Sequence, residues 1–138
     1  MNIYFACSIT GGREFQPAYE TITRALLADG HIIPTAHLAE AGVVDEERVL
    51  DPVAVYTRDT DWIRAADVLI AEVSVASHGV GYEIAFALGL GKPVLCLYQQ
   101  NRKVSKMITG NQDPHLRISS YERVEDAIRL AQEFLAVQ

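Results

Sequence analysis

Short apolar runs of strand length alternate along this chain with longer stretches of helical pattern. The strand candidates are Ile3–Ser8, His31–Pro34, Val68–Val73, Val94–Tyr98 and Leu116–Ile118. The run Val68–Ala71 is continuously apolar, which is typical of a central strand that helices cover on both faces. Strands that alternate with helices form βαβ units around a parallel sheet. This alternation constrains the fold more than any other feature of the sequence.

Four helices are predicted between these strands. They run from about Phe15 to Asp29, from Pro52 to about Ala66, from about Gly81 to Leu90, and from Val124 to Ala136, the last with a cap near Ser120. Asp51 is a cap residue followed by proline at the first helical position, and the segment 42–49 reads as a loop or a short turn. We therefore expect an α/β fold. It would be a single doubly wound domain over residues 1–138, flavodoxin- or Rossmann-like, with a five-stranded parallel sheet in the order 2-1-3-4-5.

Composition limits the classes of function. The 138 residues carry a net charge of −6, which argues against binding of a nucleic-acid polymer. No apolar run reaches membrane-spanning length and no signal peptide is evident, so we expect a cytoplasmic protein without membrane contact. Cys7 and Cys96 lie in apolar strand-like runs without metal-ligand spacing. We read them as buried thiols and expect neither a metal nor a cofactor.

Two loops are candidates for ligand binding. In doubly wound sheets, ligands bind outside the carboxyl ends of the strands where strand order reverses. This rule selects 8–13 and 74–81. In the first loop, Gly11 and Gly12 allow close backbone approach, and backbone N–H groups there can face an anion. The loop lacks the lysine of a phosphate-binding P-loop, and an ordinary strand-to-helix turn would look the same.

Glu83 is the lone charge at the start of the third predicted helix, whose next residues are apolar on every side. Such a helix should be buried. A carboxylate in a first turn is stabilised by the helix N-terminus by up to about 2 kcal/mol. We expect Glu83 to stay ionised, although a glutamate that only caps the helix would show the same pattern.

Asp59 is the second candidate carboxyl group. At 100° per residue it falls within an apolar stripe of the second helix formed by Pro52, Val55, Tyr56, Trp62, Ile63 and Ala66. Asp61 falls on the opposite side, near Arg58 and Arg64. A buried unpaired acid is costly, so we expect Asp59 to be pushed towards its neutral form. The alternative is an aspartate tied to a backbone N–H or to an arginine.

Two carboxyl groups in unlike environments can divide the roles of nucleophile and acid. Glycosidic-bond cleavage uses such a pair, with about 5–5.5 Å between the groups in a retaining enzyme. Tyr4, in the first predicted strand, lies near the same point and could hold or tune the nucleophile. It could equally be a core aromatic residue.

Four segments together carry a family resemblance. They are 4–9 with 11–13, 58–62, 79–83 and 104–108. In this order they resemble the 2′-deoxynucleoside 5′-monophosphate N-glycosidases of the nucleoside 2-deoxyribosyltransferase-like superfamily. The resemblance spans nearly the whole chain and implies hydrolysis of the N-glycosidic bond of (deoxy)nucleoside 5′-monophosphates to free base and (deoxy)ribose 5-phosphate.

The resemblance also implies roles for single residues. Glu83 would be the nucleophile, Asp59 the general acid and Tyr4 the residue that orients Glu83. Family members are homodimers, and Ser105 and Met107 would reach the site from the neighbouring chain. The full set of implied substrate contacts is Ser8, Ile9, Gly11, Gly12, Arg13, His37, Ser77, Gly79, Gly81, Ser105 and Met107.

The sequence departs from the family pattern at two positions. Thr10 stands where an arginine is usual, which removes a charge-assisted phosphate donor or shifts that role to Arg13 and Lys106. Lys106 itself replaces a small residue. Ser77 stands where base-exchanging deoxyribosyltransferases carry an acid, and this favours a phosphorylated substrate. Such a transferase, a CMP-type N-glycosidase and a nucleotide-binding module without chemistry remain alternatives.

Overall fold

The computed structural model describes residues 1–9, 11, 12, 14–39 and 49–138. Its sheet has four strands: β1 (Ile3–Ala6), β2 (Val68–Glu72), β3 (Val94–Gln99) and β4 (Leu116–Tyr121). They are parallel and lie in the order β1-β2-β3-β4. The helices are α1 (Gln16–Ala28), the 3₁₀ helix η1 (Ala36–Ala39), α3 (Pro52–Ala65), α4 (His78–Gly89), α5 (Lys106–Thr109) and α6 (Val124–Leu135).

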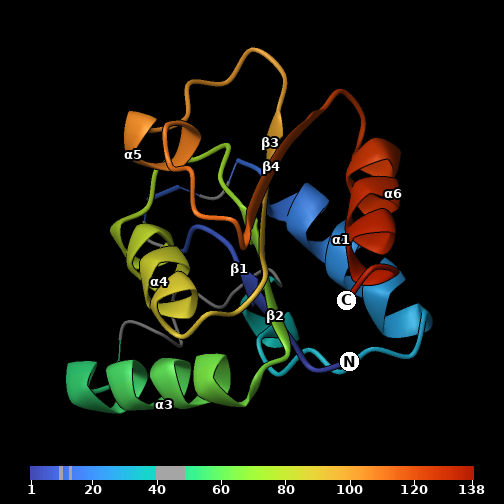
Figure 1. Ribbon diagram of the computed structural model, residues 1–138. Helices are drawn as coiled ribbons and strands as arrows, with labels where there is room; N and C mark the ends of the chain where they lie inside the picture. Colours follow the sequence, from blue (N-terminus) through green and yellow to red (C-terminus); the bar gives the residue numbers. More distant parts are fainter. Residues whose placement is uncertain (10, 13, 40–48) are drawn as a thin grey trace.

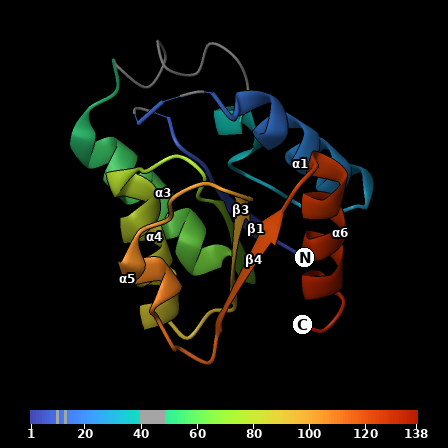
Figure 2. The ribbon, with the colours of Figure 1, turned by 90° about the horizontal axis from the view of Figure 1, so that it is seen from above.

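Helices cover both faces of the sheet (Figures 1 and 2). Alternate residues of β1 point to opposite faces, as strand geometry requires. Ile3 and Phe5 join the core beneath α1 and α6. Tyr4 and Ala6 join the core beneath α3 and α4. The doubly wound α/β architecture with buried parallel strands is therefore confirmed, and Cys7 and Cys96 are buried free thiols as expected.

The predicted strand His31–Pro34 does not form. This segment makes one isolated parallel bridge, between Asn2 and Ile32. Pro34 has no N–H to continue a ladder, and the chain turns at once into η1. The buried Oγ1 of Thr35 accepts a hydrogen bond from the Phe5 N–H at 3.0 Å, where a strand carbonyl would otherwise lie. The prediction of a five-stranded sheet in the order 2-1-3-4-5 was therefore wrong, because its second strand is missing. The described residues form a sheet of four strands.

The helix ends agree with the sequence to within a residue or two in α1, α3 and α6, and the start of α4 and the cap of α6 differ. The Asp51 side chain caps α3 by accepting from the Ala54 N–H at 3.1 Å. α4 begins at His78, three residues before the predicted start. Asp126 accepts from the Arg123 N–H at 3.2 Å, so α6 is capped at Arg123 and not near Ser120. α5 was not predicted.

Most of the segment 42–49 lies outside the described residues. Within the described ranges, no helix has the length and apolar character needed to cross a membrane.

Candidate active site

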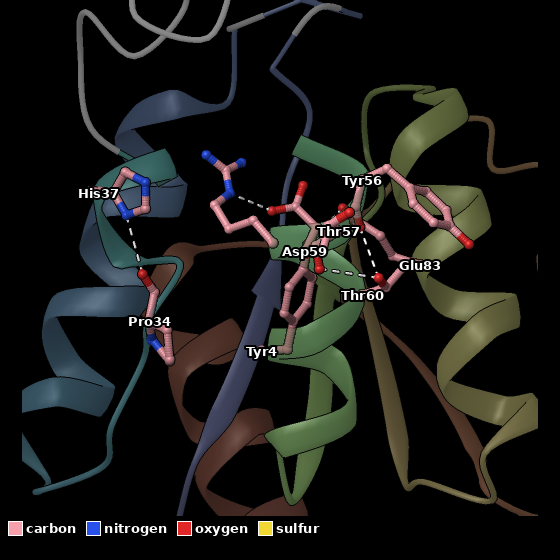
Figure 3. Close-up of polar contacts among 9 residues, drawn as sticks. Tyr4, Pro34, His37, Tyr56, Thr57, Asp59, Thr60 and Glu83 are labelled. Atoms are coloured by element: carbon pink, nitrogen blue, oxygen red, sulfur yellow. Dashed lines mark hydrogen bonds and ion pairs between the residues drawn. The ribbon is translucent and has the colours of Figure 1, made fainter. Parts of the chain in front are cut away.

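A hydrogen bond between Tyr4 and Glu83 forms the centre of the candidate site. The Tyr4 hydroxyl donates to Oε1 of Glu83 at 2.7 Å. Tyr4 is 1% exposed in the middle of β1, and Glu83 projects from α4. Figure 3 shows the Tyr4 hydroxyl directed at Glu83 and, beside them, Asp59 of α3 with its carboxyl group directed at its arginine partner. Tyr4 therefore binds only one of the two carboxyl oxygens of Glu83, and the other, Oε2, makes no contact with Tyr4.

Glu83 is not held ionised by a helix terminus, so this expectation was wrong. Because α4 starts at His78, Glu83 is the sixth helical residue and lies beyond the first turn, where the helix dipole acts. Burial raises the pKa of Glu83 to about 7, and the negative charge of Asp59 also raises it. The Tyr4 hydrogen bond and the positive charge of Arg58 oppose this shift.

Asp59 is paired, not isolated. Its Oδ1 accepts from Nε of Arg58 at 2.8 Å, and its side chain is 17% exposed. The arginine partner was the alternative explanation for a core-facing aspartate, so the premise of an unpaired buried acid was wrong. Asp61 is exposed and paired with Arg64 at 2.8 Å, as expected. Pro52 and Tyr56, placed on the buried stripe, are exposed.

Arg58 was not predicted as a site residue. Its guanidinium carbon lies 5.0 Å from the ring centroid of Trp62, and Trp62 meets the His37 ring edge-on at 5.8 Å. The His37 Nδ1 lies 3.1 Å from the Pro34 carbonyl oxygen (Figure 3). His37 therefore reaches the cluster through Trp62. The arginine–tryptophan spacing of four residues, which places two helical side chains on one face, was the available signal.

The loops after β1 and β2 lie against each other. A Cβ built on Gly11 would be 2.3 Å from the carbonyl oxygen of Ala76, so only glycine fits there. Gly12 has a φ of +131°, which also favours glycine. Ser8 is buried, and Ile9 is partly buried. Arg13 and Thr10 lie outside the described residues, so the predicted contact of Arg13 is not described here.

A cavity of about 600 Å³ lies between α4, α5 and these loops, and Ser77, Ser105, Gly11, Gly81 and Met107 are among its lining residues. The Oγ of Ser77 accepts from the Val80 N–H at 3.4 Å, and the Oγ of Ser105 accepts from the Met107 N–H at 3.2 Å. Because each Oγ acts as an acceptor in these contacts, its own hydroxyl proton is not used in them and could be donated to a ligand oxygen. The structure brings these predicted substrate residues together within one chain.

The cavity and the carboxyl cluster lie on different flanks of α4. Val80, Gly81 and Ile84 line the cavity, whereas Glu83 points to β1 and α3 (Figure 3). A Cβ on Gly81 would have nothing within 4 Å, and Gly79 has only the Ser77 hydroxyl near it. This face of α4 is thus open to a ligand or to another chain. In the described ranges, no group of three or more His, Cys, Asp or Glu side chains could hold a metal ion.

Comparisons with known proteins identify the family of this chain. The family model described as nucleoside 2-deoxyribosyltransferase matches residues 3–127. The chain is 43% identical over 116 residues to the 5-hydroxymethyl-dUMP N-hydrolase of Mus musculus, an alignment that covers 81% of this chain and 66% of the mouse protein. It is 38% identical over 111 residues to a protein of Methanococcoides burtonii provisionally named 2′-deoxynucleoside 5′-phosphate N-hydrolase 1, covering 80% of this chain and 91% of that protein.

Among solved structures, the CMP N-glycosidase of Clostridium botulinum is similar, with a TM-score of 0.74 over 96% of this chain and 98% of the other. Sequence identity is 18%, so this likeness concerns the fold alone.

Proposed function

This chain belongs to the nucleoside 2-deoxyribosyltransferase family, and we propose that it hydrolyses the N-glycosidic bond of 2′-deoxynucleoside 5′-monophosphates. The products would be the free base and 2-deoxyribose 5-phosphate. The observation that carries the proposal is the partly buried cluster of Tyr4, Asp59 and Glu83, in which Tyr4 donates to Glu83 and Asp59 lies alongside. The names of relatives at 38–43% identity support the same reaction and substrate class.

Glu83 is the proposed nucleophile. Its Oε1 accepts from Tyr4, so Oε2 is the oxygen that would attack the anomeric carbon. As the new bond forms, the C1′–N bond breaks and its electron pair leaves on the base. Water then cleaves the glycosyl ester, which returns the Glu83 carboxylate and gives the sugar phosphate.

Asp59 is the proposed acid that assists departure of the base. Arg58 occupies Oδ1, which leaves Oδ2 for a proton and the leaving group. The pKa of Glu83 near 7 means that this group carries a proton in a large part of the resting protein at neutral pH. Loss of that proton ionises the nucleophile. Asp59 would give its own proton to the departing base and take one back from the water that cleaves the glycosyl ester.

The hydroxyl groups of Ser77 and Ser105 are the proposed donors to the 5′-phosphate. Ser77 would donate from its own chain and Ser105 from the neighbouring chain. Each already accepts a backbone hydrogen bond, so each has its own proton to give. Backbone N–H groups near Gly11 and Gly12, and the side chains of Arg13, Ile9 and His37, complete the proposed contacts. A serine at position 77 is compatible with the charge of a phosphate, which a carboxylate would repel.

We further propose that the functional unit is a homodimer. Met107 is 84% exposed on α5, and Tyr82 of α4 and Leu90, which directly follows α4, are about half exposed. The neighbouring chain would cover this side of the cavity and contribute Ser105 and Met107 to the site.

A turnover assay tests the proposed function. The protein is incubated with each deoxynucleoside and ribonucleoside monophosphate, including 5-hydroxymethyl-dUMP, and the release of free base is followed by chromatography. We expect release from deoxynucleoside monophosphates and more than about a 1,000-fold loss in Glu83→Gln. Equal turnover of the matching deoxynucleosides without phosphate would contradict the proposal, as would base exchange that exceeds hydrolysis.

A further inference from the structure

The side chain of Arg58 is held in place by more than its ion pair. Residues i and i+1 on a helix do not normally face each other, yet Nε of Arg58 lies 2.8 Å from Oδ1 of Asp59. The arginine takes this position while its guanidinium lies over the ring of Trp62, one turn further along α3, at 5.0 Å. Trp62 is itself braced edge-on by His37 of η1. The Arg58 side chain is 23% exposed, so contacts within α3, braced by η1, fix its charge in a largely buried position.

The charge of Arg58 reaches past Asp59. Among the described residues, the groups that act on the charge of Glu83 are Tyr4 from β1 and Asp59 and Arg58 from α3. Tyr4 donates a hydrogen bond to Glu83, and Asp59 adds a negative charge. Arg58 is the positively charged member of these three. Arg58 acts in the same sense on Tyr4, because its charge lowers a pKa that burial and Glu83 raise. The guanidinium that is paired with Asp59 therefore also acts on the charges of Glu83 and Tyr4.

We propose that Arg58 is a positioning residue that fixes the Asp59 carboxyl group and supplies a positive charge that balances the Asp59–Glu83 pair. This inference rests on the proposed function. Arg58 balances the negative charge of Asp59, with which it is paired. Without Arg58, ionisation of Glu83 would place a second negative charge beside an unbalanced Asp59. Arg58 would thus make the nucleophile available near neutral pH without touching the substrate.

The first test measures the Glu83 carboxyl group without any substrate. The δ-carbon of glutamate is labelled with ¹³C, and its NMR shift is followed with pH in the wild type, Arg58→Gln and Arg58→Lys. The Glu83 signal is assigned by its disappearance in Glu83→Gln. An opposite charge close to a carboxyl group typically shifts its titration by about one to three units. We expect the midpoint to rise by about one unit in Arg58→Gln and by less in Arg58→Lys, which keeps the charge.

Arg64→Gln is the matched control. Arg64 lies on the same helix and makes an ion pair of the same 2.8 Å length with Asp61, but both side chains are more than half exposed. Its loss should leave the midpoint of Glu83 unchanged. Thermal unfolding of all variants identifies any that fail to fold, and in that case Arg58→Lys provides the comparison.

The second test uses kcat/KM as a function of pH. Arg58→Gln should lose activity by about tenfold on the acid side and by much less on the alkaline side, because its acid limb moves up by about one unit. A loss that is the same at every pH, or an unchanged midpoint for Glu83 in Arg58→Gln, would overturn the inference. If the wild type cleaves no nucleotide but the Glu83 midpoint still moves, the proposed function fails and the assignment of Arg58 stands.

Discussion

At the residue scale, Glu83 is the group whose environment matters most. It is half-buried between α3 and β1, and among the described residues Tyr4 donates a hydrogen bond to it. Its pKa of about 7 in the folded protein exceeds its ordinary value of 4.5. Between these two pH values the folded state keeps a proton that the unfolded state has released. Stability therefore falls as the pH rises from about 4.5 to about 7, and the full penalty is present above pH 7.

This fall in stability with rising pH gives a prediction for Glu83→Gln. Glutamine has the shape of the protonated acid and can still accept from Tyr4, but it cannot ionise. The variant should match the wild type in stability near pH 4.5 and exceed it at pH 8 by up to about 3 kcal/mol, at 1.36 kcal/mol per pKa unit. Urea unfolding at both pH values measures this. Glu122→Gln, at an exposed site, is the control. A Glu83→Gln variant no more stable than the wild type at pH 8 would contradict the raised pKa.

Asp59→Asn tests the division of roles between the two carboxyl groups. If Asp59 delivers a proton to the departing base, its loss should slow cleavage of poor leaving groups by about 100-fold or more. A substrate whose base leaves without protonation should be affected much less. The ratio of kcat/KM values for an activated base analogue and a natural base measures this difference. Equal losses for both substrates would exclude the acid role and leave Asp59 as a group that only positions.

At the scale of elements, a second buried carboxyl group joins three strand ends. Glu72, the last residue of β2, is fully buried and accepts hydrogen bonds from the Ser74 hydroxyl and from the Tyr121 hydroxyl of β4, the latter at 2.9 Å. The Ser74 Oγ in turn accepts from the Gln99 N–H of β3 at 2.8 Å. Burial raises the pKa of Glu72. This network anchors the start of the loop that leads to Ser77 and α4.

Tyr121→Phe should therefore destabilise the protein more than an ordinary tyrosine substitution. It removes one donor from a buried carboxyl group at no cost in packing, and an unsatisfied buried polar group costs about 1–3 kcal/mol. Tyr56→Phe is the matched control, because the Tyr56 hydroxyl meets that of Tyr82 at the surface at 3.2 Å. Its effect should stay within about 0.5 kcal/mol. Urea unfolding of both variants provides the measurement, and equal effects would mean that the network contributes no stability.

The elements also show what the sequence could predict. Periodicity predicted α1 and α3 to within a residue or two and four of the five strand candidates, because apolar patterning and proline or glycine at the ends agree there. The strand at 31–34 failed because Thr35 replaces the ladder with a side-chain contact that only the tertiary structure reveals. The start of α4 was misplaced because Gly79 and Gly81 read as loop residues, whereas the Ser77 cap carries the helix through both.

The sequence predicted which residues lie together at the candidate site better than it predicted their charge environment. Tyr4, Asp59 and Glu83 follow from their places on the strand and the helices, and the structure brings all three together. Their charge environment does not follow, since it depends on where α4 begins and on the direction of the Arg58 side chain. Neighbouring residues on a helix project about 100° apart. The contact of Arg58 with Trp62 shows why the arginine side chain nevertheless turns back towards Asp59.

At the scale of the whole molecule, α4 and α5 leave an apolar surface beside the cavity. The sequence of α4 after Glu83 predicted burial on every side, yet Ala85 and Leu90 are exposed in the single chain. Ser105 and Met107 already line the cavity that holds Ser77. Two such cavities placed face to face across a two-fold axis would bury α4 as its sequence predicts and would bring α5 of each chain to the site of the other.

Complementation tests this assembly. One chain carries Glu83→Ala, and the other carries Ser105→Trp, which fills the cavity. If Ser105 serves the neighbouring site, a mixed dimer has one site with both defects and one site with neither. Free exchange should then restore about a quarter of wild-type activity, since about half of the dimers are mixed and half of their sites are intact. If Ser105 serves its own chain, every site keeps one defect and activity does not return. Native mass spectrometry confirms exchange, and a monomeric wild type at assay concentration would contradict the dimer itself.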